Sequence, residues 1–266
     1  MVDKTNGGAR WRLEGRRVLI TGGTKGIGAA IAAELLELGA TVTVTARGEA
    51  EIGARLADWK AYGYSAYGIP ADMTLPEDRW RAMDYALEAM GGLDILVNNA
   101  GTNRRGPSLE ITPQDYALVM ETNVTAPWEM CRIAHPHLKA ASIQTGDACI
   151  VGIGSVAGSK YIGSGAPYAM SKAAMDELTK YLAVEWAADG IRVNGVNPWY
   201  TKTPLANRVL DDPQFTERVL ARTPIKRIAD PADIAGMVAF LCLPVARHIT
   251  GQNVAVDGGY LANGAF

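Results

Sequence analysis

Short apolar runs alternate along the chain with longer segments whose apolar positions recur at helical spacing. Short β-branched runs bounded by turn residues predict strands, and the longer periodic segments predict helices. The predicted strands are residues 17–21, 41–45, 65–70, 93–98, 148–153, 192–196 and 253–256. The predicted helices are residues 26–38, 49–61, 76–90, 112–139 with a bend near Pro127, 167–188 and 231–241.

Strands that alternate with helices predict a parallel sheet with helices on both faces. The chain has 266 residues, and neither a linker rich in Gly, Ser or Pro nor a repeat divides it. The fold class is therefore predicted to be α/β, with a single doubly wound domain of the Rossmann type over residues 1–266. Residues 1–12 are predicted to form a flexible arm. Residues 198–228 are predicted to be irregular with a short helix or two.

Composition and charge argue against several classes of function. The net charge is -2 and the Lys and Arg residues are scattered, so nothing favours binding to nucleic acid or to an anionic membrane. No apolar run reaches about 18 residues, so no transmembrane helix is expected. The N-terminus lacks the apolar segment of a signal peptide. Three cysteines without a CxxC pair predict buried, reduced thiols in a cytoplasmic protein, and the three histidines predict no metal site.

A glycine-rich turn, TGGTKGIG at residues 21–28, follows the first predicted strand and opens the first predicted helix. Glycine permits a tight turn and close backbone approach, and the free N–H groups of a helix N-terminus bind a pyrophosphate. The chain has no GKS or GKT, which disfavours an ATP-type phosphate loop. A plain glycine-rich turn is the alternative, but its place in the first strand–helix unit favours a dinucleotide.

The end of the second predicted strand indicates which dinucleotide binds. Proteins that bind NAD usually have Asp or Glu here for the ribose hydroxyls, whereas this chain has TVTVTARG, with no acid before Glu49. Arg47 can contact a 2′-phosphate through charge-assisted hydrogen bonds, and Lys25 in the glycine-rich turn adds a second cation. The sequence therefore favours NADP(H) over NAD(H). The alternative is that both residues are ordinary surface charges.

The segment YAMSK places Tyr168 and Lys172 four residues apart, with Ser155 thirteen residues before Tyr168. Residues i and i+4 share one face of a helix. An ammonium beside a phenol stabilises the phenolate and lowers its pKa from about 10, which would make the phenol a usable acid near neutral pH. Ser155 could then hold a substrate oxygen. Taken alone, the spacing also fits an exposed tyrosine with a solvated lysine.

Eight motifs in order resemble the short-chain dehydrogenase/reductase family, from about Leu13 to Gly259. They are TGGTKGIG, ADMT, NNAG, ETNV, Ser155, YAMSK, IRVNGVNP and ITGQNVAVDGG. Within the family, RWRLEGRRVLITGGTKGIG, NNAGTNRR, NPWYTKTPL and ITGQNVAVDGGYLANG resemble the tropinone reductase-like group, whose members do not share one substrate.

The resemblance implies a catalytic role for four residues. Asn123 would bend its helix and hold a water that links Lys172 to solvent. Ser155 would orient the substrate oxygen, Tyr168 would exchange its proton, and Lys172 would hold the nicotinamide ribose and lower the pKa of Tyr168. With Arg47 and Lys25 included, the predicted cofactor-binding residues are Gly22, Thr24, Lys25, Gly26, Ile27, Gly28, Arg47, Asp72, Met73, Asn98, Asn99, Ala100, Gly101, Tyr168, Lys172, Pro198, Trp199, Thr201 and Thr203, of which Asp72 and Met73 would contact adenine.

The long segment 198–228 is expected to lie over the active site as a mobile lid, because ligands bind outside the carboxyl ends of the strands. Its apolar residues, with those after Ser155, predict a mostly apolar substrate pocket. The pocket residues are Val156, Tyr161, Ile162, Trp199, Tyr200 and Leu205. Arg104 and Arg105 at its rim could attract an anionic substrate, although a solvated surface or an intersubunit ion pair is the favoured alternative.

Two positions depart from the family pattern. Trp199 stands where the family commonly has glycine, and its indole is expected to pack over the nicotinamide pocket or to border the substrate. Gly154 stands where the family often has serine, and the missing side chain is expected to leave more room near the reacting carbon. Neither departure changes the four catalytic residues.

The sequence thus predicts an NADP(H)-dependent enzyme that reversibly reduces an apolar or cyclic ketone to a secondary alcohol, with Tyr168 as proton donor. One alternative is an NAD(P)-dependent alcohol dehydrogenase that works in the oxidative direction. The other is a catalytically idle dinucleotide-binding sensor. The resemblance also implies a homotetramer whose main contact is formed by the two long helices, residues 112–139 and 167–188.

Overall fold

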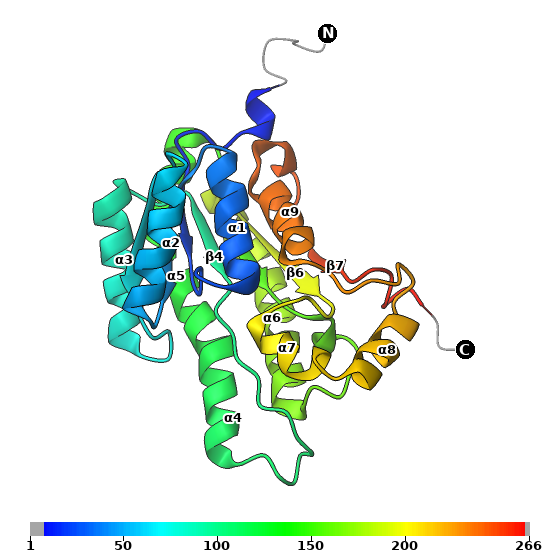
Figure 1. The fold of residues 1–266 in the computed structure, drawn as a ribbon. Helices are drawn as coiled ribbons and strands as arrows, with labels where there is room; N and C mark the ends of the chain where they lie inside the picture. The colour runs from blue at the N-terminus through cyan, green and yellow to red at the C-terminus, as the bar shows by residue number, and fades with distance from the viewer. Residues whose placement is uncertain (1–7, 264–266) are drawn as a thin grey trace.

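One parallel sheet organises residues 8–263, the part of the chain that this computed structural model describes. Its strands are β1 (Arg17–Ile20), β2 (Thr41–Ala46), β3 (Ala66–Pro70), β4 (Ile95–Asn98), β5 (Ala148–Ile153), β6 (Ile191–Pro198) and β7 (Asn253–Val256). Their order is β3-β2-β1-β4-β5-β6-β7 (Figure 1). The predicted α/β fold is therefore confirmed. The strand order reverses between β1 and β4, and this is the position at which such sheets bind ligands.

Helices cover both faces of the sheet because alternate strand residues point to opposite sides. Val18 and Ile20 join a core with α1 and α9, whereas Leu19 joins a second core with α3, α5 and α6. The helices are α1 (Gly26–Glu37), α2 (Glu49–Ala61), α3 (Pro76–Met90), α4 (Pro113–Met120), α5 (Ala126–Thr145), α6 (Ala166–Glu185), α7 (Pro204–Leu210), α8 (Pro213–Ala221) and α9 (Pro231–Cys242).

The segment predicted as one bent helix over residues 112–139 is two helices separated by a π-helical turn, Glu121–Thr125. Asn123 lies in this turn, and the interruption comes before Pro127 rather than at it. Pro127 occupies the first turn of α5, which follows the π turn directly, with helical backbone at Thr125 and Ala126. The interruption thus lies at Asn123, where the family resemblance implied a bend, and not at Pro127.

The predicted irregular segment 198–228 contains two short helices, α7 and α8, which begin at the N-caps Thr203 and Asp212. Residues 1–7 of the predicted arm lie outside the described residues. The last residues of that arm include a 3₁₀ turn, Ala9–Trp11, and the Trp11 ring lies 6.4 Å from the ring of Phe240 in α9.

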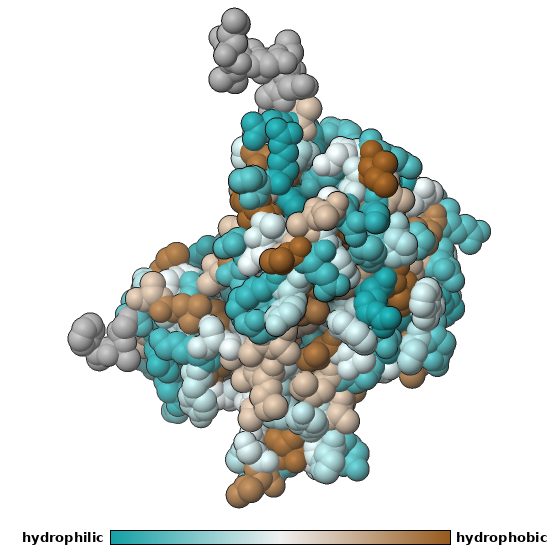
Figure 2. Space-filling model, turned by 180° about the vertical axis from the view of Figure 1, so that it is seen from behind, coloured by the Kyte–Doolittle hydropathy of each residue, from teal (hydrophilic) through white to brown (hydrophobic). Residues whose placement is uncertain are grey.

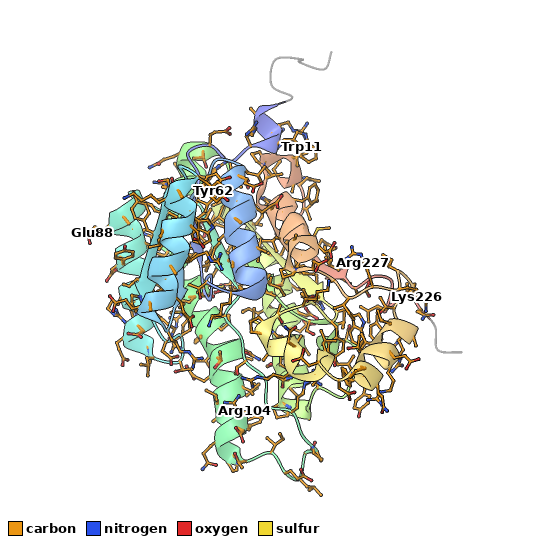
Figure 3. All side chains as sticks on the ribbon, in the orientation of Figure 1. Trp11, Tyr62, Glu88, Arg104, Lys226 and Arg227 are labelled. Atoms are coloured by element: carbon orange, nitrogen blue, oxygen red, sulfur yellow. The ribbon has the colours of Figure 1, made fainter. Side chains whose placement is uncertain are left out.

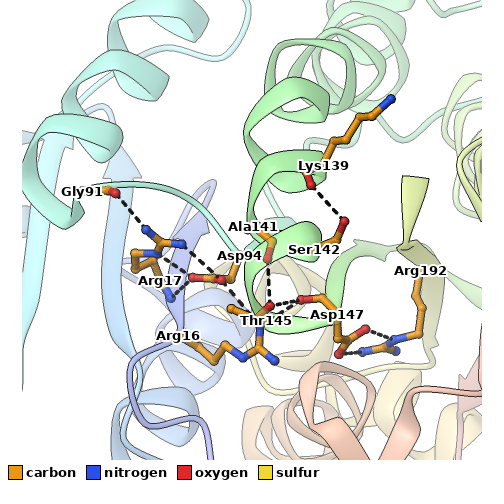
Figure 4. A network of polar contacts seen from close by, with 10 residues as sticks. All are labelled: Arg16, Arg17, Gly91, Asp94, Lys139, Ala141, Ser142, Thr145, Asp147 and Arg192. Atoms are coloured by element: carbon orange, nitrogen blue, oxygen red, sulfur yellow. Dashed lines mark hydrogen bonds and ion pairs between the residues drawn. The ribbon is translucent and has the colours of Figure 1, made fainter. Parts of the chain in front are cut away.

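Ion pairs tie the amino ends of the central strands together (Figure 4). Asp94, just before β4, accepts a hydrogen bond of 2.6 Å from Arg17 at the start of β1. Asp147, just before β5, is bound by Arg192 of β6 at 2.8 and 3.1 Å. These contacts lie at the opposite end of the strands from the crevice described above, so we assign them to holding the sheet together.

Apolar side chains are exposed on the face opposite α1 and α9, where Figure 2 shows brown and tan residues along the lower part of the molecule. The helices of that face expose large apolar side chains: Tyr116, Trp128, Met170, Tyr181 and Val184.

Among residues 8–263, no helix combines the length and hydropathy needed to cross a membrane. Cys131, Cys149 and Cys242 are buried and form no disulfide, as predicted.

Candidate active site

The fold brings three of the predicted catalytic side chains together at the carboxyl end of β5. Ser155 follows β5 directly, while Tyr168 and Lys172 lie one turn apart on α6. The Ser155 hydroxyl accepts a 3.1 Å hydrogen bond from the Ala157 N–H and lies close enough to the Tyr168 phenol to lower its pKa. The Lys172 ammonium is buried and donates a 2.7 Å hydrogen bond to the Ile153 carbonyl, at the last residue of β5. The alternative of an exposed tyrosine with a solvated lysine is thereby excluded.

Lys172 is an unusual lysine because it is only 5% exposed. Burial lowers its pKa from 10.5 to about 8, and the nearby Asp176 carboxylate opposes this shift. The ammonium lies 5.6 Å from the Tyr168 ring centroid. A buried cation is therefore held beside the phenol, as the spacing predicted.

The predicted lowering of the Tyr168 pKa is wrong for the protein by itself. Burial raises the pKa of this phenol, and this effect exceeds the opposing hydrogen bond from Ser155 and the opposing charge of Arg105. The physical reason is that removing a phenolate from water costs more than these two groups recover. Lys172 also directs its N–H towards Ile153 rather than towards the phenol.

Asn123 connects the π turn to the strand ends. Its amide oxygen accepts a 2.8 Å hydrogen bond from the Thr102 N–H, and its NH₂ donates to the Thr102 carbonyl and to Ser171 on α6. A Cβ at Gly101 would lie 3.4 Å from the Asn123 oxygen and 3.7 Å from the Lys172 nitrogen. Asn123 thus fixes the backbone beside Lys172, and Gly101 lies next to both side chains.

The glycine-rich turn is suited to the pyrophosphate of a dinucleotide. Neighbouring atoms leave no room for side chains at its glycines, so a ligand can approach the backbone closely. Gly22 has φ +70°, and a Cβ at Gly28 would lie 2.2 Å from the Gly22 carbonyl oxygen. The Asn99 NH₂ donates to the carbonyls of Thr21 and Gly22 at 3.0 and 2.8 Å. Thr24 and Ile27 complete the turn, which ends at the free N–H groups of α1.

Replacing Gly28 with alanine is expected to weaken NADPH binding at least tenfold and to destabilise the fold by about 1–3 kcal/mol, because the new methyl group overlaps Gly22 and Asn99. The measurements are NADPH fluorescence titration and thermal unfolding. Gly53→Ala is the matched control, since nothing lies within 4 Å of its Cβ position in α2. Unchanged NADPH affinity in Gly28→Ala would contradict the assignment of this turn.

Cations gather near the ribose end of this turn. Arg47 follows β2 and is exposed. Lys25 forms an ion pair with Glu51 of α2, so a 2′-phosphate would have to compete with a carboxylate for it. Arg55, which sequence reasoning missed, donates to the Thr24 carbonyl at 3.4 Å. The sequence shows only that Arg55 follows Arg47 by eight residues on a predicted helix. Its contact with the glycine-rich turn depends on how α2 packs.

The two asparagines of NNAG differ in role. Asn98 points beneath the sheet and donates to the Cys131 sulfur at 3.2 Å, so its side chain stabilises the core, whereas Asn99 holds the glycine-rich turn. At the predicted adenine site, one Asp72 oxygen accepts hydrogen bonds from Thr74. Met73 beside it is buried. The backbone N–H of Ala100 is fixed by the Thr21 hydroxyl at 3.1 Å.

The segment after β6 closes over the glycine-rich turn. A Cβ at Gly26 would lie 3.1 Å from the Thr203 methyl group, so the start of α7 lies against the turn. Pro198 ends β6, and Thr201 is buried and pairs with Ala229. The start of α7 and the glycine-rich turn are therefore neighbouring parts of the predicted cofactor site.

The predicted pocket residues do not form one apolar surface. Val156 is fully buried behind Ser155, Tyr161 is 89% exposed and Leu205 is 43% exposed. Ile162 is half-buried. The Trp199 indole stacks on Tyr260 at 3.7 Å and donates to the Thr223 hydroxyl, and Tyr200 lies against its edge. Trp199 is thus held by the C-terminal segment, a contact that local sequence could not predict.

The expected extra room at Gly154 is not found. A Cβ there would lie 1.9 Å from the Asn197 amide oxygen, so the Asn197 side chain already occupies the space. Asn197 in turn donates to the Asp176 carboxylate at 3.0 Å. Gly154 therefore admits a buried polar contact between β6 and α6, and it does not enlarge the site.

Among residues 8–263, no group of three or more His, Cys, Asp or Glu could hold a metal ion.

Comparison with known proteins agrees with this geometry. A family model described as Enoyl-(Acyl carrier protein) reductase matches residues 22–261. The chain belongs to the short-chain dehydrogenase/reductase family and is an oxidoreductase of that family.

Its sequence is similar to tropinone reductase homolog At5g06060 of Arabidopsis thaliana, with 44% identity over 96% of each chain. Its structure is similar to a gluconate 5-dehydrogenase from Burkholderia cenocepacia J2315 in complex with NADP and tartrate, with TM-score 0.90 and 32% identity over 96% of this chain and 99% of that one. It is also similar to a 7α-hydroxysteroid dehydrogenase complexed with NADH and 7-oxo glycochenodeoxycholic acid, with TM-score 0.90 and 30% identity over 95% and 96% of the two chains.

Proposed function

We propose that this protein is an NADP(H)-dependent oxidoreductase that reversibly reduces a ketone to a secondary alcohol. The observation that carries the proposal is the buried Lys172, whose nitrogen lies 5.6 Å from the Tyr168 ring centroid, with the buried Ser155 close to the same phenol. A cation of this kind is costly to bury, and burial of a lysine next to an acid–base group is typical of active sites. When bound, NADPH supplies the hydride.

Each side chain has a defined task in this proposal. The Ser155 hydroxyl donates a hydrogen bond to the substrate carbonyl oxygen and fixes its position beside the Tyr168 phenol. Tyr168 gives its proton to that oxygen during reduction and takes it back during oxidation. Lys172 stabilises the phenolate left after transfer by its charge. Asn123 holds the backbone at Thr102 and α6 so that these groups keep their places.

The substrate is proposed to be a ketone with an apolar or cyclic body. Ile162 and Leu205 are partly accessible apolar residues on the two segments that flank the site, and the fully buried Val156 packs beneath it. Segment 198–228, with α7 and α8, is proposed as the lid. The titration of NADPH oxidation against cyclic ketones, aliphatic ketones and β-keto esters tests the function.

Turnover of no ketone, and of no secondary alcohol with NADP⁺, by a protein that binds NADPH would instead favour a catalytically idle dinucleotide sensor. Turnover of alcohols alone would favour the oxidative reading. The same residues serve both directions, so the kinetic constants in each direction have to be measured.

Arg47→Ala is expected to reduce the preference for NADPH over NADH about 10- to 100-fold, because a charge-assisted contact to the 2′-phosphate is worth about 1.5–3 kcal/mol. The measurement is the NADPH/NADH ratio of kcat/KM. The relative bound to NADP supports the choice of cofactor, as does the absence of an acid at the end of β2. Lys60→Ala, an exposed cation on α2, is the control. An unchanged ratio in Arg47→Ala would exclude this role.

The proposed partners are a small ketone or alcohol and further copies of the same chain. The exposed apolar side chains of α4, α5 and α6 support a homotetramer with its main contact on these helices, because such residues are costly to leave in water. Buried free thiols support a cytoplasmic location.

A further inference from the structure

An aromatic cluster lies beside the proposed active site and is assembled from three distant parts of the chain. Trp199 stacks on Tyr260 with an interplanar angle of 9°, and Tyr200 contacts Trp199 at 4.6 Å and Phe215 at 5.4 Å between ring centroids. Tyr200 and Tyr260 are 7% and 2% exposed. The cluster is therefore a mostly buried platform, built largely from the segment proposed as the lid and joined to the C-terminal segment through Tyr260.

Three cations lie on this platform. The Arg105 guanidinium donates a 3.2 Å hydrogen bond to the Tyr200 hydroxyl. The Lys160 nitrogen lies 5.1 Å, and the Arg222 guanidinium 5.8 Å, from the Tyr260 ring centroid. We call these five residues, Arg105, Lys160, Tyr200, Arg222 and Tyr260, the cationic wall.

The positive charges of the cationic wall are not compensated by neighbouring acids. Within residues 8–263, none of its three cations has a carboxylate within ion-pair distance, whereas the adjacent Arg104 binds Asp115 at 2.9 Å beside α4 (Figure 3). The nearby Asp257 has both oxygens bound to backbone N–H groups, of Gly259 and Leu261. The wall thus carries three positive charges without an ion-pair partner among the described residues, so it attracts an anion.

The Arg105 and Tyr200 part of the wall lies near the reacting group. The charge of Arg105 lowers the pKa of the Tyr168 phenol, and Tyr200 raises it, so both side chains lie close enough to act on that phenol. The Tyr260 hydroxyl is buried and has no hydrogen-bond partner among the described residues. A buried hydroxyl without a partner costs free energy, and a ligand oxygen is one way to satisfy it.

We propose that the cationic wall binds a carboxylate carried by the substrate, so that the ketone substrates are oxo acids and the alcohols are hydroxy acids. The planar guanidinium of Arg105 can bind the two carboxylate oxygens in parallel, and Tyr200 holds that guanidinium in place. Lys160 and Arg222 add attraction at longer range. This inference rests on the proposed function, because it names the substrate class of the same site, and it adds an anionic end to the apolar body proposed above.

The test compares oxo acids with their methyl esters, which keep the carbonyl and the size but lose the charge. The substrates are 2-, 3-, 4- and 5-oxo acids of six to eight carbons, each assayed with NADPH beside its ester. At least one acid is expected to exceed its ester about tenfold or more in kcat/KM. In Arg105→Gln this ratio is expected to fall about 10- to 100-fold, through KM of the acid, because a charge-assisted contact is lost. The loss for the ester is expected to be at least tenfold smaller.

Arg104→Gln is the matched control, since its arginine is adjacent but already paired with Asp115, and it is expected to keep the acid-to-ester ratio. Glutarate supplies a second measurement, as a competitive inhibitor of ester reduction that weakens at least tenfold in Arg105→Gln. Equal kcat/KM for every acid and its ester, with glutarate inhibition the same in both proteins, would overturn the inference while the proposed function stands.

If no ketone or ester is reduced, the proposed function fails. The wall is then tested alone, by calorimetric titration of the NADPH-loaded protein with glutarate. Binding that is lost in Arg105→Gln and kept in Arg104→Gln supports the wall. Absence of binding to the unmodified protein overturns it.

Discussion

Tyr168→Phe is expected to lower kcat for ketone reduction by about 10³-fold or more, since general acid catalysis commonly contributes about 10²–10⁴-fold. The substitution removes only the hydroxyl that donates the proton, and the ring keeps its place on α6. NADPH affinity is expected to stay within about threefold of the unmodified protein, because no other group moves. Steady-state kinetics and fluorescence titration measure the two quantities. A folded Tyr168→Phe protein that keeps its turnover would disprove the proposed mechanism.

Tyr161→Phe is the matched control for this experiment. It removes the same atom from a side chain on the segment after Ser155 that is 89% exposed.

Because burial raises the pKa of Tyr168, the phenol stays protonated at neutral pH and is ready to donate. Reduction is therefore expected to persist through neutral pH, whereas oxidation, which needs the phenolate, is expected to increase as the pH rises. Tyr161→Phe should retain both pH profiles.

The sequence predicted the sheet well because strand patterns are local. Each strand is a short apolar run between turn residues, and all seven predicted runs are found as strands. The Tyr168–Lys172 spacing was also local, so its placement on one helix was predictable. An irregularity of the helix at Asn123 was expected from the family resemblance, but the hydrogen bonds of Asn123 with Thr102 and Ser171 were not, because those residues come from other elements.

Properties that depend on packing between distant segments could not be predicted. The direction of the Tyr168 pKa shift follows from how deeply the phenol is buried, and the space at Gly154 is filled by Asn197 from the next strand. The stack of Trp199 on Tyr260 joins the end of β6 to the C-terminal segment. The sequence placed Arg105 at the rim of an apolar pocket, but that Lys160 and Arg222 lie over Tyr260 follows only from the packing of distant segments.

Lys172→Met is expected to lower kcat about 10²-fold and yet to stabilise the protein at pH 7. The buried ammonium has a pKa of about 8, against 10.5 for the ordinary group. Below pH 8 the folded protein therefore carries a charge that its interior disfavours. Since each unit of pKa shift corresponds to about 1.36 kcal/mol, the charge lowers the free energy of unfolding by about 3 kcal/mol. Methionine avoids this cost. It also leaves the Ile153 carbonyl without its hydrogen-bond donor, which destabilises the variant by about 1 kcal/mol or more. The net gain expected in the free energy of unfolding is about 1–2 kcal/mol.

This stability difference has a defined dependence on pH. Between pH 8 and 10.5 the unfolded chain keeps the lysine proton while the folded protein releases it, so the unfolded state binds more protons and stability rises with pH. Across this window, the free energy of unfolding of the unmodified protein should therefore rise relative to that of Lys172→Met, by up to about 3 kcal/mol. Urea unfolding of both proteins at pH 7, 8, 9 and 10 measures the difference, in which other titrating groups cancel. Lys180→Met, an exposed lysine two turns along α6, is expected to show no such change. A difference between Lys172→Met and the unmodified protein that stays constant with pH would show that Lys172 is not a lysine of lowered pKa.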